Sequence, residues 1–184
     1  MKHLVLLALL ASPAGAETCP AAPDHTTPVA ELLLQVQRAT DETTAKVISN
    51  RLWEYYADAP DAAAQEILDR GMRKRAAWDL LGARDDFDAL VAYCPNYAEG
   101  YNQRAFVNFL RSDFAAALPD LEQAISLSPQ HVAAKSGRAL VLIGLGRHDD
   151  GQEALAEALE LNPWLPERAL LQGADAGGDK GEDL

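Results

Sequence analysis

The side chains that could hold a metal ion or act as a nucleophile are few and widely spaced. The chain contains two cysteines, Cys19 and Cys94, and four histidines. A four-ligand zinc site needs more cysteine or histidine at close spacing, and no motif of a serine hydrolase, a zinc protease or a phosphate-binding loop is present. The sequence therefore predicts no catalytic residue, no metal site and no cofactor.

A cluster of acids, Asp85, Asp86 and Asp88, is the one group that suggests paired carboxylates. Acids are also favoured at the N-terminus of a helix, because they interact with the helix dipole and the free N–H groups there. Since a helix is expected to begin near Arg84, we interpret the cluster as capping residues and not as an acid–base pair.

The composition indicates a single globular domain that avoids nucleic acid. The chain has 184 residues, of which 48% are hydrophobic and 24% are charged, and its formal charge is −12. A surface of this sign repels phosphate groups, and no apolar run is long enough to span a bilayer. We therefore expect neither nucleic-acid binding nor membrane insertion.

Residues 1–16 have the three-part layout of a secretory signal peptide. Met1-Lys2-His3 is basic, an apolar run follows from Leu4 to Ala11, and Ala14-Gly15-Ala16 supplies small residues for cleavage. A buried N-terminal helix is the alternative, and a lipoprotein anchor is disfavoured because the residues before Cys19 do not fit a lipobox. We expect an exported protein, located in the periplasm, with an extended tail over residues 17–28.

Export decides how the two cysteines are interpreted. In an oxidising compartment a lone pair of cysteines favours a disulfide, so we predict a bond between Cys19 and Cys94. Such a bond would tie the N-terminal tail to the middle of the chain and, from chain entropy, stabilise the fold by about 4 kcal/mol. Two unpaired thiols, one of them buried, are the alternative.

The most regular feature of the sequence is a period of 34 residues. Proline recurs at this spacing at Pro95, Pro129 and Pro163. An arginine followed by a small residue recurs on the same period, at Arg70-Gly71, Arg104-Ala105 and Arg138-Ala139. An apolar residue lies eight positions before each proline, at Phe87, Leu121 and Leu155. Coincident registers over three copies predict three structural repeats.

Each copy divides into two segments with apolar residues at helical spacing. In the middle copy these are residues 98–110 and 114–127, with Asp113 as a helix cap between them. The other predicted helices cover residues 131–145 and 149–161 in the third copy, and 61–75 and roughly 84–93 in the first, which has a longer junction through Trp78. Two more amphipathic segments precede the repeats, at residues 29–39 and 41–57.

This pattern resembles the tetratricopeptide repeat (TPR) family, whose 34-residue unit is a helix pair with small residues where the helices meet and a proline near its end. The resemblance implies a small exported bacterial protein that folds as an all-α, right-handed α-solenoid. Its three repeats would cover residues 64–97, 98–131 and 132–165. The first of these matches the family pattern least well. It further implies a helical cap over residues 29–63, which a degenerate repeat could form, a C-terminal solvating helix over residues 166–172, and a disordered acidic tail over residues 173–184.

Some repeats of this family pair an arginine of the first helix with an aspartate of the second. The matching pairs here are Arg70 with Asp86 and Arg104 with Asp120. In the third copy Ala154 occupies the aspartate position, so we expect Arg138 to turn to the neighbouring Glu153. We interpret these as structural ion pairs and not as an anion-binding ladder, because the arginines adjoin the tightly packed small residues.

In this family the first helices of successive repeats line a concave groove that binds a peptide or a protein segment. Carried over residue by residue, the resemblance places the following side chains in the groove: Met72, Arg75, Glu99, Asn102, Phe106, Phe109, Ser136 and Leu140. The alternative is that some of them pack between repeats. The basic residues with which some members clamp the C-terminus of a chaperone are missing, so that ligand is not expected.

The sequence therefore predicts a non-enzymatic adapter or scaffold of the cell envelope, which binds a protein or peptide of unknown identity in the groove. A structural subunit of a homo-oligomer is the first alternative, and the sequence does not fix the oligomeric state. A small hydrolase or transferase with an unrecognised site is the second.

Overall fold

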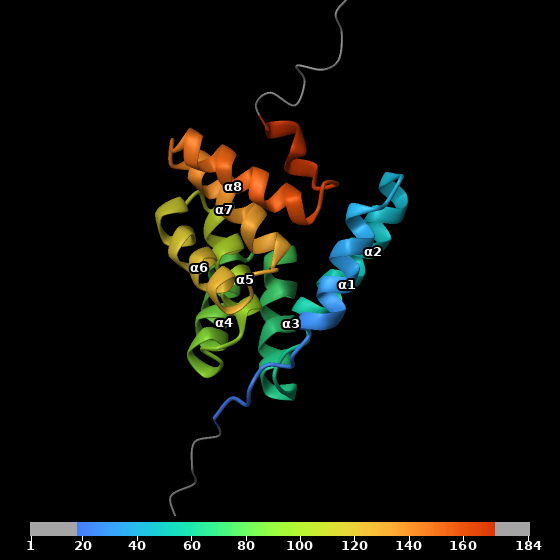
Figure 1. Ribbon diagram of the computed structural model, residues 1–184. Coiled ribbons are helices and arrows are strands. Elements are labelled where there is room, and N and C mark those ends of the chain that lie inside the picture. Colours follow the sequence, from blue (N-terminus) through green and yellow to red (C-terminus); the bar gives the residue numbers. More distant parts are fainter. Residues whose placement is uncertain (1–17, 172–184) are drawn as a thin grey trace, which may run out of the picture.

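The computed structural model describes residues 18–171, so the expected signal peptide and the whole of the expected acidic tail lie outside the described residues. Within that range the chain forms eight α-helices, one short 3-10 helix and no strand (Figure 1). The α-helices are α1 (Thr26–Gln37), α2 (Glu42–Tyr56), α3 (Ala62–Ala76), α4 (Leu80–Tyr93), α5 (Ala98–Leu110), α6 (Phe114–Leu127), α7 (Val132–Gly144) and α8 (His148–Leu161). The all-α fold predicted from the sequence is confirmed.

Helices α3 to α8 form three antiparallel pairs, and each helix packs on the next one along the chain. The interfaces are filled by the small residues of the 34-residue period, since Ala83, Ala105, Ala117 and Ala139 are fully buried. Gly71 shows why these positions must be small: a Cβ atom there would lie 2.5 Å from the ring of the fully buried Phe87. Because the residues at these positions are small, the two helices of each pair can pack closely together.

The turn inside each pair has the same length and shape in all three repeats. Trp78, Ser112 and Gly146, which are 34 residues apart, all have positive φ values, of 61°, 58° and 77°. Two of the turns continue into a capping aspartate, because the side chains of Asp79 and Asp113 accept hydrogen bonds from the N–H groups of Gly82 and Ala116. The expectation of a longer first junction was therefore wrong, and α4 begins at Leu80 instead of Arg84.

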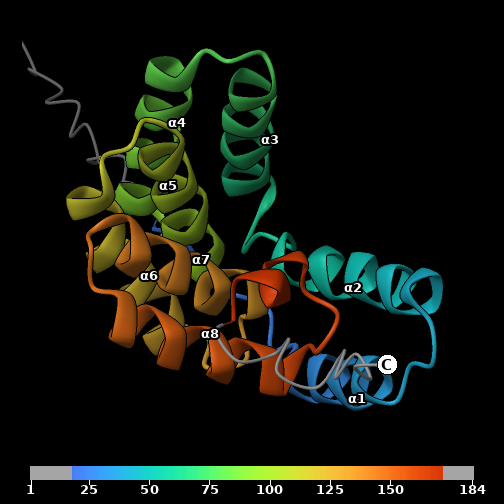
Figure 2. The same cartoon turned by 90° about the horizontal axis from the view of Figure 1, so that it is seen from above.

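The hairpin of α1 and α2 does not stack on α3 as a further repeat would. Its apolar residues form a cluster that includes Leu33, Val36 and Leu52 and that packs on Val132 at the start of α7 and on Trp164 beyond α8. Figure 2 shows the hairpin beside α8 and the C-terminal segment, far along the molecule from α4. Thus the expected cap over residues 29–63 is helical, but it does not form a degenerate fourth repeat in the stack.

Hydrogen bonds fix the hairpin to the C-terminal repeat. The side chain of Gln37 donates to the backbone oxygen of Glu160 over 2.8 Å, and the Asn162 amide donates to the Ser49 hydroxyl over 3.1 Å. After α8 the chain forms a 3-10 helix, Pro166–Leu170, where the sequence predicted a short solvating helix over residues 166–172. Because the hairpin and this segment meet, the molecule closes on itself instead of remaining an open solenoid.

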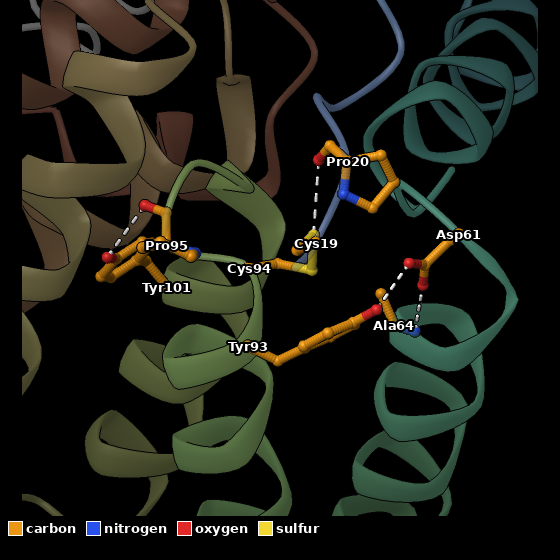
Figure 3. Close-up of a disulfide and its surroundings, with 8 residues drawn as sticks. All are labelled: Cys19, Pro20, Asp61, Ala64, Tyr93, Cys94, Pro95 and Tyr101. Carbon is orange, nitrogen blue, oxygen red and sulfur yellow. Dashed lines mark hydrogen bonds between the residues drawn. A yellow bond between two sulfur atoms is a disulfide. The ribbon is translucent and has the colours of Figure 1, made fainter. Parts of the chain in front are cut away.

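The predicted disulfide between Cys19 and Cys94 is present, with 5.1 Å between the two Cα atoms. Cys94 is the buried residue that ends α4, and Cys19 lies in the tail that leads to α1 (Figure 3). Close by, Asp61 caps α3 through the N–H of Ala64 and also accepts a hydrogen bond of 2.8 Å from the hydroxyl of Tyr93. The bridge therefore fixes the start of the hairpin against the first repeat.

Candidate functional site

A cavity of about 330 Å³ lies on the side of the solenoid formed by the first helices of the repeats. Helix α5 contributes Asn102, Phe106 and Phe109, and helix α7 contributes Ala133, Ser136, Gly137 and Leu140. Residues three or four positions apart lie on one face of a helix, and the opposite face of α5 carries Val107, which is fully buried. The amphipathic pattern of α5 and α7 thus places these side chains in the cavity.

Six of the eight residues that the sequence predicted for the groove line this cavity: Arg75, Asn102, Phe106, Phe109, Ser136 and Leu140. The other two do not. Met72 is half buried and packs against the core between α3 and α4, and Glu99 is 1% exposed. Phe109 has a divided role, because it also contacts the ring of Phe114 on α6.

Four lining residues come from segments that the repeat pattern did not connect with the groove. Trp53 of α2 is one, and Leu165, Pro166 and Glu167 of the C-terminal segment are the others. They reach the cavity because the N-terminal hairpin folds back onto the C-terminal repeat. The 34-residue period carries no signal for this contact, since none of the four lies within a matched helix. Trp53 and residues 165–167 narrow the groove to a partly enclosed pocket.

Beneath the cavity, Glu99 is held by three donors. Its carboxylate accepts hydrogen bonds from the Asn102 amide over 3.0 Å, from the Gln103 amide, and from Nε2 of His131 over 2.8 Å. The Nδ1 atom of His131 accepts the N–H of Ala134, so this side chain also caps α7. These bonds satisfy a buried carboxylate, and Glu99 is therefore a structural residue.

Arg75 is the only positively charged side chain that lines the cavity within the described range. Its guanidinium lies 4.9 Å from the centre of the Phe106 ring and donates a hydrogen bond to the side chain of Gln103. Burial lowers the pKa of Arg75 below its usual value, and the charge of Glu99 acts in the opposite direction. An arginine of this kind remains charged at neutral pH and can receive an anion.

The predicted ion pairs are present between the helices of the first and second repeats. Arg70 lies 2.9 Å from Asp86, and Arg104 makes two hydrogen bonds to Asp120, of 2.8 and 2.6 Å. The three acids near residue 86 are not caps, because they lie in the middle of α4; Asp86 and Asp88 pair with arginine instead.

In the third repeat the expected partner of Arg138 was wrong. Arg138 lies 2.6 Å from Glu157, not Glu153. Glu157 is four residues further along α8 than Glu153, and so occupies the same helix face one turn later. Arg138 therefore reaches along α8 to the next acid on that face.

A second cavity, of about 510 Å³, lies where the N-terminal tail and the end of α2 meet the start of α5 and the loop before α7. His25 and Asp58 are 2.7 Å apart there, and Tyr56 stacks on His131 with 4.1 Å between ring centres. No Ser or Cys contacts His25 among the hydrogen bonds of the described residues. Between residues 18 and 171, no three His, Cys, Asp or Glu side chains are close enough together to hold a metal ion.

Comparison with known proteins agrees with the helical repeat. Residues 109–173 match the tetratricopeptide repeat family. A TPR repeat-containing protein of Rhizobium etli is 26% identical over 133 residues, which cover 72% of this chain and 65% of that protein. The chain spans about two thirds or less of the length of the curated relatives it matches.

Two solved structures have a similar fold. The first TPR of Spaghetti (RPAP3) bound to an HSP90 peptide has a TM-score of 0.57 and 21% identity, and the match covers 58% of this chain and 85% of that one. The TPR2B domain of yeast Sti1 in a complex with an Hsp70 peptide has a TM-score of 0.54 and 22% identity, with 63% and 89% covered. No helix between residues 18 and 171 is long and apolar enough to cross a membrane.

Proposed function

We propose that this chain, which carries tetratricopeptide repeats on an all-α solenoid, binds a segment of another protein in the cavity between α5 and α7. The observation that supports this most strongly is the cavity itself. It lies on the side formed by the first helices of the repeats, has apolar walls that include Phe106, Phe109 and Leu140, and is also lined by a few polar side chains. Such a combination is typical of a site for a peptide or another small ligand.

The similar solved structures support a peptide as the ligand class, because two of them hold chaperone peptides. The basic residues with which some members of the repeat family clamp such tails are missing here, and the small residues Ala133 and Gly137 line the cavity wall. We infer a different peptide sequence, and an adapter or scaffold role without catalysis or cofactor.

The setting that we propose is the bacterial cell envelope, with export to the periplasm. Two observations support it: residues 1–16 have the layout of a signal peptide, and the bond between Cys19 and Cys94 is of the kind that persists in an oxidising compartment. A fusion of the full chain to alkaline phosphatase tests the setting in a Gram-negative host. Phosphatase activity that requires residues 2–16 is expected, and equal activity without them would contradict export.

Selection from a displayed library of random peptides tests the binding role. Wild-type protein is expected to enrich a peptide family that the Phe106→Asp variant does not bind, since an aspartate in the apolar wall would need to be desolvated by the ligand. Leu81→Asp is the matched control, because Leu81 is an exposed apolar residue of α4 that does not line the cavity. Both variants are first checked for wild-type thermal unfolding.

Failure to enrich any peptide, or equal binding by wild type and Phe106→Asp, would overturn the assignment of the cavity. Light scattering of the purified protein complements the selection. A dimer dissociated by Phe106→Asp would favour burial of this face in a homo-oligomer instead.

A further inference from the structure

Arg75 is a half-buried cation without a carboxylate partner in the described part of the chain. No Asp or Glu oxygen lies within 4 Å of its guanidinium there, in contrast to Arg70, Arg104 and Arg138. Its one hydrogen bond to a side chain goes to the neutral amide of Gln103. A guanidinium has five N–H donors, so donors remain for a ligand on the cavity side.

The nearby Glu99 does not take this role. Its oxygens are occupied by Asn102, Gln103 and His131, and the side chain is 1% exposed. Gln103 stands between the two charges, since it donates to Glu99 and accepts from Arg75. The arrangement holds the Arg75 guanidinium over the Phe106 ring, which positions its remaining donors without neutralising the charge.

Large apolar side chains lie next to this cation. Phe106 and Trp53 are 41% and 43% exposed, although both line the cavity. The volume of about 330 Å³ is at the lower end of the range for ligand pockets. Because Trp53 and the segment from Leu165 to Glu167 narrow the groove, the pocket fits a short extended segment with one large side chain better than a long helix.

We propose that the pocket selects an internal peptide segment in which a large aromatic or aliphatic residue adjoins an aspartate or glutamate. The apolar side chain packs against Phe106 and Leu140, and the carboxylate pairs with Arg75. Among the described residues, Arg75 is the one cation and Glu167 the one acid that line the cavity. This proposal rests on the peptide-binding function proposed above, and it requires no free C-terminus in the ligand.

Fluorescence polarisation with three labelled nonapeptides tests the selectivity. The peptides have glycine–serine flanks, acetylated and amidated ends, and the central sequences Asp-Phe-Asp, Lys-Phe-Lys and Asp-Ala-Asp. The first is expected to bind wild-type protein about tenfold or more tightly than either of the others, because each of those lacks one of the two contacts. Added salt should weaken the first peptide most.

Variants of Arg75 assign the charge preference to this residue. Arg75→Gln is expected to bind the acidic and basic phenylalanine peptides within about threefold of each other, and Arg75→Met, which keeps the apolar stem over Phe106, to do the same. Arg73→Gln is the matched control, since Arg73 is exposed two residues away on α3 and does not line the cavity. It should retain the tenfold preference.

The results separate the two proposals. If the displayed library gives no peptide sensitive to Phe106→Asp, the peptide-binding function itself fails. If the library gives such peptides but they lack acidic residues, or if their affinity is unchanged in Arg75→Met, only the selectivity proposed for Arg75 is overturned. Tight binding that disappears when the peptide's C-terminus is amidated would also contradict it.

Discussion

At the scale of single residues, the arginine–aspartate pairs decide how the two helices of a repeat are held together. Arg104 is the best connected, because it binds Asp120 of its own repeat through two hydrogen bonds and Asp88 of the preceding repeat through one of 2.9 Å. Asp120 is buried, whereas almost half of the Asp88 side chain is exposed. Burial makes the two ion pairs, Arg104 with Asp120 and Arg104 with Asp88, unequal in energy although their distances are similar.

Replacement of Asp120 by asparagine should therefore cost more than the same change at Asp88. We expect Asp120→Asn to lower the free energy of unfolding by about 2 kcal/mol, because it leaves a partly buried guanidinium without its buried charged partner. Asp88→Asn should cost less than about 1 kcal/mol, as for other exposed pairs. Urea denaturation at pH 7 measures both, and equal losses would contradict the difference in burial.

Asp86 links stability to pH. Burial by itself raises the pKa of this carboxyl, but hydrogen bonds and charge from Lys74 and Arg70 outweigh it, and the net effect is a pKa below the usual value. A carboxylate whose pKa is lower in the folded state stabilises the protein above its unfolded-state pKa, near 4, and this contribution is lost as the pH falls through the folded-state value.

The Asp86→Asn variant should consequently be less stable than wild type at pH 7, and the difference should shrink below about pH 4. Chemical denaturation at a series of pH values from 7 to 2.5 measures it. Asp85→Asn is the control, because Asp85 is an exposed neighbour on the same helix and should leave the pH dependence unchanged. A constant difference over the whole series would argue against the lowered pKa of Asp86.

At the scale of the elements, the turn within each repeat depends on one residue in the left-handed region of the backbone. Gly146 adopts this conformation without cost, but Trp78 and Ser112 adopt it with a Cβ atom. The same turn position in the three repeats therefore carries three residues that differ greatly in how easily they adopt a positive φ. The geometry of the helix pair therefore requires a positive φ at this position, and the conformational preference of the residue itself does not decide it.

Trp78→Gly should stabilise the protein by about 0.5–1 kcal/mol, since it relieves the strain of a positive φ at the end of a helix. The Trp78 side chain is 71% exposed, so little packing is lost. Thermal and urea denaturation measure the change, with Gly146→Ala as the opposite test, which should destabilise. A loss of stability in Trp78→Gly would show that the indole makes contacts that outweigh the strain.

The same turn explains which helices could be predicted from the sequence. The bounds of α5 and α6 were predicted correctly because small residues, apolar spacing and Asp113 all indicate the same register. The start of α4 was missed because tryptophan is not a residue that indicates a left-handed turn. Asp79, which caps that helix, was the signal that could have corrected it.

At the scale of the whole molecule, the main feature is the return of the N-terminal hairpin to the C-terminal repeat. The repeat period positions Arg75, Asn102, Phe106 and Ser136 along one groove, because each position recurs on the first helix of a pair. It says nothing about Trp53 or Leu165, which close the groove from outside the paired helices of the three repeats. Tertiary contacts between segments more than 100 residues apart have no local pattern, so only the structure reveals a pocket.

The disulfide is one of the contacts that hold the hairpin in this arrangement, and its removal gives the last prediction. The hairpin is held by the apolar cluster around Leu33 and Val36, by the Tyr56 hydroxyl, which donates to the backbone of Gln130 over 2.6 Å, and by the tail fixed at Cys19. Cys19→Ser removes only the last of these. Up to about 4 kcal/mol of stability is expected to be lost, since the bridge closes a loop with a sequence separation of 75 residues.

Amide hydrogen exchange shows which helices lose stability when the disulfide is removed. In Cys19→Ser, and in wild type with the bridge reduced, α1 and α2 should exchange faster than before by a larger factor than α5 and α6, because the repeats keep their own cores. Agreement between the variant and the reduced protein is the control for effects of the serine itself. Uniform acceleration over all eight helices would instead mean that the hairpin and the repeats unfold as one unit, and that Trp53 cannot leave the pocket independently of the solenoid.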